Sequence, residues 1–225
     1  MRRLVIKTSK TIRRRIYNFL REQLLSGEIQ PHQHLIEAKI AQDIGTSRTP
    51  VREALHSLEL EGLVESIPRV GYVVRPISEE EVEEICEIRA AIEGLAARWA
   101  MEKDHKKLVT ELGKNISVSE HKVSKGDLGT FVDMDARFHE TISKFSGSQR
   151  LLELAQTLRR HMLRYRIQSI YSMGNVLRAI DGHKAILRAM ERRNVEGVNK
   201  AIRNHMEQVK KDVLRYAFKP PKESY

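Results

Sequence analysis

The sequence predicts a mainly α-helical protein with an N-terminal winged helix-turn-helix and a C-terminal, all-α antiparallel bundle. Residues 37–75 contain two short helical runs separated by a three-residue turn, and two β-rich pieces follow them. That order is typical of a helix-turn-helix with a β-hairpin wing. From residue 78 onward strand signals nearly vanish, and the only prolines there are Pro220 and Pro221. Long amphipathic helices with short connections indicate an antiparallel bundle.

The length of 225 residues suits one or two domains, and we expect residues 1–76 to form the first and residues 77–225 the second. The net charge of +10 favours a polyanionic partner, and the first 15 residues carry seven basic side chains and no acidic one. The single cysteine, Cys86, cannot form an intrachain disulfide and is expected in the core. No apolar run is long enough for a signal peptide or a membrane span, so we expect a cytoplasmic protein with no membrane partner.

Residues 8–25 are expected to form the first helix, because apolar side chains recur there at helical spacing. Those side chains are Ile12, Ile16, Phe19 and Leu24. Gly27 and Pro31 end this helix and make a turn. His32 and His34 fall in the loop that follows. Their spacing also allows a metal site, but we interpret them as solvated loop histidines.

Residues 37–44 and 48–61 are the expected helices of the helix-turn-helix. The second helix has one apolar face, formed by Val51, Leu55 and Leu58. Its other face carries Arg48, Thr49, Arg52 and His56. Two arginines one turn apart near a helix start can bind guanine edges or phosphates in a major groove. The alternative is an ordinary solvated helix face, which the neighbouring turn and hairpin argue against.

The wing is expected from two short β-rich runs, residues 63–67 and 71–75, on either side of Pro68-Arg69-Val70. Gly62 precedes the first run, and a pair of short runs around such a turn indicates a hairpin.

The segment SRTPVREAL, followed by EGLVESIPRVGYVV, resembles the DNA-binding domain of the GntR superfamily of bacterial transcription regulators over roughly residues 8–76. The resemblance implies that double-stranded operator DNA is a partner. It also implies a set of DNA contacts from the second helix and the wing: Ser47, Arg48, Thr49, Arg52, Arg69 and Gly71, the last two near the minor groove. FadR-like members have another DNA-contacting arginine where this sequence has Ala38, so that contact is expected to be absent or replaced.

The four residues RPIS at 75–78 form the expected linker, because Pro76 cannot continue a strand and Ser78 is a good N-cap. Five glutamates crowd the next turns, which suits a helix N-terminus. The expected helices of the second domain span residues 78–102, 104–124, 127–145, 148–172, 175–193 and 195–217.

Three of these helices have an ionisable side chain where the apolar seam predicts a large hydrophobic one. Asp135 interrupts the seam of the third helix, and His139 follows one turn later on the same side. His183 and His205 interrupt the seams of the last two helices. Leaving a carboxylate unpaired in a core costs several kcal/mol, so these groups must find partners.

Imidazoles and a carboxylate that converge from three helices make a site for a divalent transition metal. We expect zinc first, and nickel, manganese or iron suit the same ligands. The alternative is a polar core in which each histidine is hydrogen-bonded and Asp135 is an acceptor.

The segments DMDARFHE, GHKAIL and NHME resemble the FCD ligand-binding domain that follows GntR-type heads, over roughly residues 79–210. This resemblance implies an all-α bundle in which a small carboxylate effector completes the coordination of a metal. The metal ligands that it implies are Asp135, His139, His183 and His205.

The effector pocket has three further candidates. The FCD resemblance implies an arginine that faces the cavity, and Arg89 occupies that position; a surface pair between Arg89 and Glu93 is the alternative. His161 either lines the pocket or belongs to the core. Arg166 is the arginine of its helix that we expect to reach the pocket.

These observations lead to one main hypothesis and two alternatives. The main hypothesis is a transcription regulator, not an enzyme, that binds a palindromic operator as a homodimer and responds to a small organic acid bound near the metal. The first alternative is a metalloenzyme with a DNA-binding head, although no general base or nucleophile is evident beside the ligands. The second is a regulator whose signal is the metal itself; ligands buried on three helices argue against it because they resemble a permanent cofactor site.

Overall fold

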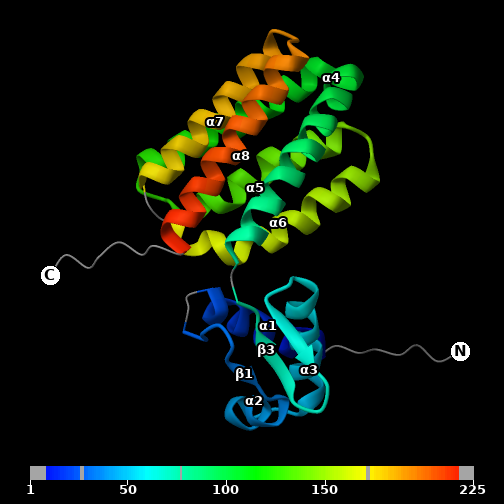
Figure 1. Cartoon of the computed structure of the whole chain (residues 1–225), viewed down its shortest axis with the longest axis vertical. Coiled ribbons are helices and arrows are strands. Elements are labelled where there is room, and N and C mark those ends of the chain that lie inside the picture. The colour runs from blue at the N-terminus through cyan, green and yellow to red at the C-terminus, as the bar shows by residue number, and fades with distance from the viewer. Residues whose placement is uncertain (1–8, 26–27, 77, 171–172, 218–225) are drawn as a thin grey trace, which may run out of the picture. The chain divides into compact units, whose positions relative to one another are not determined.

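The computed structural model describes residues 9–25, 28–76, 78–170 and 173–217. The chain divides into two compact units, Met1–Ile77 and Ser78–Tyr225 (Figure 1). Each unit has its own hydrophobic core. The predicted fold class is confirmed, because the first unit holds a helix-turn-helix with a small sheet and the second is a helical bundle.

The helices described in the first unit are α1 (Ser9–Leu25), α2 (Glu37–Ile44) and α3 (Arg48–Leu60). Gly45 ends α2 with a φ of 73°, a left-handed conformation that glycine adopts without steric strain. This turn lets α3 start three residues after Gly45, at Arg48, as the sequence predicts. α3 packs into the core through one fully buried face, made by Val51, Ala54, Leu55 and Leu58.

The sheet of the first unit has the strand order β1–β3–β2, with antiparallel pairing throughout. Its strands are β1 (His34–Leu35), β2 (Val64–Ile67) and β3 (Gly71–Val74). The hairpin of β2 and β3 is the predicted wing. The prediction of a loop at His34 is wrong: His34 pairs with Val73, in a strand too short to show an alternating pattern. Gly71 permits this pairing, because a Cβ there would lie 2.9 Å from the Leu35 carbonyl oxygen.

The buried face of α1 differs from the predicted stripe. Ile16 and Leu20 are buried, whereas Ile12 and Phe19 are 43% and 51% exposed. α1 packs against α3, and this contact covers only part of the apolar surface of α1. The spacing of apolar residues shows which residues share a helix face, but not how much of that face a neighbouring helix covers.

The helices described in the second unit are α4 (Glu79–Ser124), α5 (Gly129–Phe145), α6 (Gln149–Ile170), α7 (Met173–Glu191) and α8 (Val195–Ala217). α4 packs against the other four, and α7 runs beside α8 (Figure 1). Cys86 is buried, as predicted. No helix in the described ranges is both long and apolar enough to cross a membrane.

α4 contains both of the helices predicted for residues 78–102 and 104–124. Its start is capped as expected, because the Ser78 hydroxyl accepts a hydrogen bond from the Glu81 N–H at 3.3 Å. Asp104 is non-helical, with φ −146° and ψ 71°, so the chain kinks where the break is predicted. Next to the kink, His105 Nε2 donates a hydrogen bond to the Met190 carbonyl at 2.7 Å and ties α4 to the end of α7.

Candidate functional site

The exposed face of α3 carries the helical residues that are expected to meet DNA. Arg48, Thr49 and Arg52 are all exposed. Ser47 is the N-cap residue of α3, and its side chain makes no capping hydrogen bond. The first turn of α3 contains no acidic residue. A helix N-terminus with basic side chains and unpaired N–H groups is suited to phosphate oxygens and base edges.

Arg52 is bound by Glu37, the first residue of α2. Arg52 Nε and Nη2 donate to the two carboxylate oxygens of Glu37 at 2.8 Å and 2.7 Å. The hydrogen bond from Arg52 holds the pKa of Glu37 below its usual range, so the carboxylate stays ionised at neutral pH. This two-point pair fixes the plane of the guanidinium. A DNA contact by Arg52 therefore has to share the guanidinium with Glu37 or replace that carboxylate.

The tip of the wing is a β-turn in which the Val70 N–H donates to the Ile67 carbonyl at 3.1 Å. Pro68 and Arg69 are the two central residues, and Arg69 has a φ of 65°. Proline followed by a residue with positive φ is the pattern of a type II turn, in which the second position favours glycine or asparagine. An arginine there costs conformational energy, which points to a role for its side chain outside the turn.

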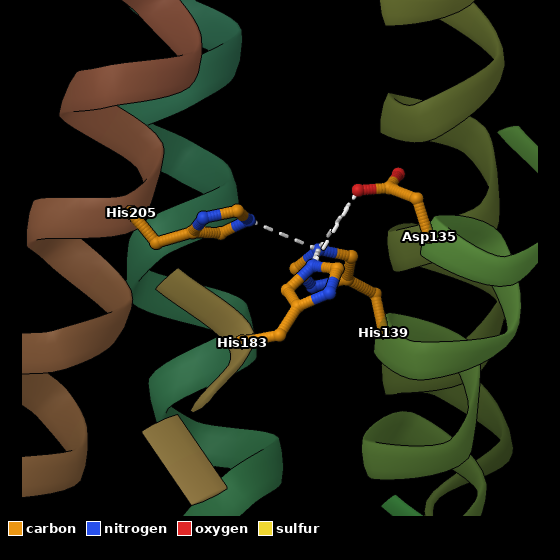
Figure 2. A group of neighbouring side chains, drawn as sticks. All are labelled: Asp135, His139, His183 and His205. Atoms are coloured by element: carbon orange, nitrogen blue, oxygen red, sulfur yellow. Dashed lines mark hydrogen bonds and ion pairs between the residues drawn. The ribbon is translucent and has the colours of Figure 1, made fainter. Parts of the chain in front are cut away.

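Four buried side chains converge inside the second unit (Figure 2). Asp135 and His139 come from α5, His183 from α7 and His205 from α8. Each is at most 3% exposed, and one ligand atom from each lies within 4.8 Å of all the others. His139 Nε2 lies 3.3 Å from the Nε2 atoms of His183 and His205, and Asp135 Oδ1 lies 3.5 Å from His183 Nε2. The structure thus brings all four predicted ligands together.

Glu93 of α4 connects this cluster to Arg89. The Nδ1–H of His139 donates to Glu93 Oε2 at 2.6 Å. Arg89 Nε donates to Glu93 Oε1 at 2.9 Å, and Arg89 Nη2 forms an ion pair with the same oxygen at 2.8 Å. Burial alone would raise the pKa of Glu93, but the Arg89 guanidinium and His139 hold it far below its usual range. The ionised carboxylate can only accept hydrogen bonds, so His139 carries its proton on Nδ1 and turns the Nε2 lone pair toward the cluster.

Packing sets the orientation of the other two imidazoles. The ring of His183 stacks on Phe138, with 4.0 Å between centroids and 11° between planes. The ring of His205 lies against the α7 backbone, where a Cβ on Gly182 would be 2.4 Å from His205 Nδ1. Burial, with the neighbouring His183 and His139, lowers the pKa of His205 well below its usual value. His205 is therefore neutral at physiological pH, the state in which imidazole binds a metal.

The donor set fits a transition metal. Two nitrogens bound about 2.1 Å from one tetrahedral zinc lie about 3.4 Å apart, close to the two Nε2 separations of 3.3 Å. In a neutral imidazole only one ring nitrogen has a proton, so His139, with its proton on Nδ1, presents a lone pair at Nε2 to the other two rings. A cation at their centre would satisfy every lone pair. Asp135, His139, His183 and His205 could therefore hold a metal.

A cavity of about 350 Å³ reaches this cluster at His139. Its walls come from α4, α5 and α6, and its lining comprises Arg89, Glu93, His139, Glu140, Leu152, Ala155, Gln156, Arg159 and Arg160. Arg89 is buried, and its Nη1 has no hydrogen-bond partner in the described structure. A buried, unsatisfied cationic N–H in a cavity wall is suited to an anionic ligand atom.

The predicted pocket residues have different positions. Arg89 lines the cavity and also forms the pair with Glu93 that was the alternative, but the pair is buried rather than at the surface. His161 is half-buried and is not part of the cavity lining, and the side chain of Arg166 lies outside the described residues. Arg159 and Arg160 line the cavity as well, and neither was predicted from the sequence. Their only signal was the density of arginines on this helix, which does not distinguish the cavity side from the solvent side.

Known proteins resemble this chain along both units. The gntR family of bacterial regulatory proteins matches residues 12–74, and the FCD domain matches residues 84–208. An uncharacterized HTH-type transcriptional regulator in an unstable DNA locus of Streptomyces ambofaciens is 30% identical, over 94% of this chain and 89% of that protein. The gluconate operon transcriptional repressor of Bacillus licheniformis is 27% identical, over 84% of this chain and 80% of that protein. The solved structure of E. coli McbR/YncC has the same fold, with a TM-score of 0.71 and 24% identity over 95% of this chain and 100% of that one.

Proposed function

The chain belongs to the gntR family of bacterial regulatory proteins and carries an FCD domain, and we propose a function on this basis. The protein regulates transcription in response to a small carboxylate bound beside a metal. The relatives compared above are transcription regulators, not enzymes, so the metalloenzyme alternative has no support. The observation that carries the proposal is the buried cluster of Asp135, His139, His183 and His205 next to a cavity with an unsatisfied arginine N–H.

The head binds operator DNA through the exposed start of α3 and the wing. Ser47, Arg48, Thr49 and Arg52 meet the major groove, and Arg69 and Gly71 approach the minor groove. The exposure of the three α3 side chains supports these contacts, and so does the unfavourable φ of Arg69 at the wing tip. Operator DNA in bacteria lies in the cytoplasm, so we place a protein that binds it there.

The bundle holds one divalent transition metal on Asp135, His139, His183 and His205, with zinc as the first choice. When bound, such a metal supplies a Lewis-acidic centre that attracts an anionic oxygen. Glu93 keeps His139 in the tautomer that a metal needs. Arg89 Nη1 donates to a carboxylate oxygen of the effector in the cavity. The gluconate operon repressor among the relatives agrees with a small organic acid as effector.

Regulation requires that the effector favours one arrangement of the protein over another. α4 can transmit this coupling, because it carries Arg89 and Glu93 and begins at Glu79, close in sequence to the end of the first unit. We propose a homodimer that binds a palindromic operator, since a two-fold protein reads a two-fold site.

The first experiment is elemental analysis of full-length protein purified without chelator, for wild type, His183→Ala and the matched control His121→Ala. His121 is an exposed histidine of α4 outside the cluster. We expect about one metal per chain in the wild type and in the control, and a loss of metal in His183→Ala. Metal in none of the three would show that the cluster is a hydrogen-bonded polar core, and it would sink the metal part of the proposal.

The second step is selection of operator DNA from random duplexes, followed by titration with metal and with carboxylates. We expect an enriched palindrome, and a carboxylate that changes the operator affinity of the metal-loaded protein. A change caused by metal alone, with no response to any carboxylate, would make the metal itself the signal.

A further inference from the structure

A second groove, of about 800 Å³, lies between α4 and α8 and is larger than the cavity beside the metal cluster. Its α4 wall includes Glu87, Ala91, Gly94 and Arg98, and its α8 wall includes Arg203. None of the four cluster residues lines it. Among the described residues, no buried polar atom of this lining lacks a hydrogen-bond partner. The groove therefore gives no sign of a small polar ligand, in contrast to the cavity beside the cluster.

The α4 wall of the groove has opposite charges at its two ends and small side chains in the middle. Glu87 and Arg98 are exposed, and neither forms an ion pair within the described part of the chain. Ala91 follows Glu87 by four residues, and Gly94 precedes Arg98 by four. Residues four apart lie on the same side of a helix, so one face of α4 holds all four residues. At the rise of a helix its two charges are about 16 Å apart.

This face of α4 is complementary to a second copy of itself. A two-fold axis perpendicular to α4, at the midpoint of the face, sets the two α4 helices antiparallel. Glu87 of each copy then lies opposite Arg98 of the other, and Ala91 lies opposite Gly94. Small side chains at such a crossing let two helices come close together. Because a two-fold interface repeats each contact, the favourable charge pair occurs twice.

The α8 wall also suits a protein partner. Arg203 and Asn204 are exposed in the lining, and Arg203 forms no ion pair in the described ranges. Glu207, the other exposed charge of this wall, is already paired with Lys210 at 2.8 Å. Arginine is enriched at interfaces between proteins. A small ligand would reach only one end of the α4 face, whereas an antiparallel helix covers its whole length.

We propose that this groove is the contact between two copies of the chain, held in register by ion pairs between Glu87 of each copy and Arg98 of the other. The inference rests on the proposed function, in which a homodimer binds a palindromic operator, and it assigns the surface that forms that homodimer. Like charges that face each other across an interface cost far more than an exposed ion pair gains. Charge exchange is therefore a sharp test.

The test is sedimentation equilibrium of full-length Glu87→Arg and Arg98→Glu, each alone and mixed in equal amounts. Each variant alone places like charges at both contacts, so we expect the Kd of its dimer to rise roughly 10- to 100-fold. In the mixture one variant supplies two positive ends and the other two negative ends. Opposite charges then face each other at both contacts, and we expect a mixed dimer with an affinity close to that of the wild type.

The controls are Arg150→Glu and Glu153→Arg, which reverse exposed charges of α6 outside the groove lining. Both should dimerise as the wild type does. Circular dichroism checks that every variant is folded. The double variant, Glu87→Arg with Arg98→Glu, exchanges both charges and should also dimerise as the wild type does, which keeps the test valid if a single variant is unstable.

The outcomes separate this inference from the proposed function. Single variants that dimerise with wild-type affinity, or a mixture that does not recover it, would overturn the inference and leave the groove to another occupant. A wild-type dimer in those experiments would leave the proposed homodimer standing on another face. A wild type that is monomeric both free and on operator DNA would overturn the inference and the homodimer together.

Discussion

At the residue scale, Glu93 is the buried carboxylate that joins the four-residue cluster to Arg89. It is a buried carboxylate with two buried partners, Arg89 and His139, and each of its oxygens serves one of them. Removing one member of a buried ion pair leaves the other charge uncompensated, which costs several kcal/mol. Glu93 therefore affects both the stability of the bundle and the tautomer of His139, a proposed metal ligand.

Glu93→Gln is expected to lower metal affinity roughly 10- to 100-fold, the usual effect of losing a hydrogen-bond partner of a ligating histidine. The measurement is competition with a chromophoric chelator. The matched control is Glu140→Gln, which removes a charge from the same cavity but touches Gln156 and Lys144 rather than a ligand. A second variant, Arg89→Met with Glu93→Gln, removes the uncompensated charge and keeps the test valid if the single variant unfolds. Wild-type metal affinity in the double variant would contradict the role of Glu93.

Arg69 offers a residue-scale test that separates folding from DNA binding. Its positive φ disfavours any side chain with a Cβ, so Arg69→Gly is expected to leave the free energy of unfolding unchanged or to raise it by up to about 1 kcal/mol. Operator affinity should fall, because the wing loses its cation. Chemical denaturation and fluorescence anisotropy measure the two effects. Equal operator affinity in the variant would show that Arg69 makes no DNA contact.

At the element scale, α7 and α8 approach each other at a glycine. A Cβ on Gly182 would lie 2.4 Å from His205 Nδ1, so the ring of His205 lies in space that only glycine leaves free. Glycine inside a helix is otherwise unfavourable by roughly 0.5–1 kcal/mol relative to alanine. The position of the His205 ring, rather than the stability of α7, explains the glycine.

Gly182→Ala is therefore expected to weaken metal binding on the order of tenfold, because it displaces the His205 ring, even though alanine is the better helix former. The control is Gly113→Ala in α4, where a Cβ would meet only Leu187 Cδ2 at an ordinary distance of 3.9 Å. That control should raise the free energy of unfolding by roughly 0.5–1 kcal/mol without changing metal affinity. Metal titration and thermal unfolding of both variants check this. An unchanged metal affinity for Gly182→Ala would show that the His205 ring can shift without weakening metal binding.

At the scale of the whole molecule, the two units have separate cores and one covalent connection at Ile77–Ser78. A ligand that binds only the folded bundle stabilises it by mass action, by about 4 kcal/mol when its concentration is 1,000 times its Kd. Chelation is therefore expected to lower the unfolding temperature of the bundle by roughly 10 °C. The unfolding temperature of the DNA-binding head should not change. Differential scanning calorimetry with and without chelator measures both unfolding temperatures. An unchanged unfolding temperature of the bundle after chelation would contradict a structural metal.

Most of the fold could be predicted from the sequence, because helical periodicity and turn residues are local signals. α2 has the predicted bounds, Glu37–Ile44, and the break in α4 falls at the predicted Asp104. The exceptions are contacts between distant segments. His34 becomes a strand residue only because Gly71 lets the backbone of β3 come close to Leu35. Likewise, the apolar residues of α1 do not indicate that α3 covers Ile16 and leaves Phe19 exposed.

The helices, the turn, the wing and the four cluster residues could all be predicted from the amino-acid pattern, since a polar side chain in an apolar seam is visible from helical spacing alone. What surrounds the cluster depends on packing between helices. The spacing of Arg89 and Glu93 suits a surface pair and a buried one equally, and burial distinguishes the two. Similarly, Arg159 and Arg160 line the cavity because of how α6 packs against α4 and α5. Periodicity places a side chain on a face of its own helix, whereas a site is made where faces of several helices meet, and that depends on packing across the whole unit.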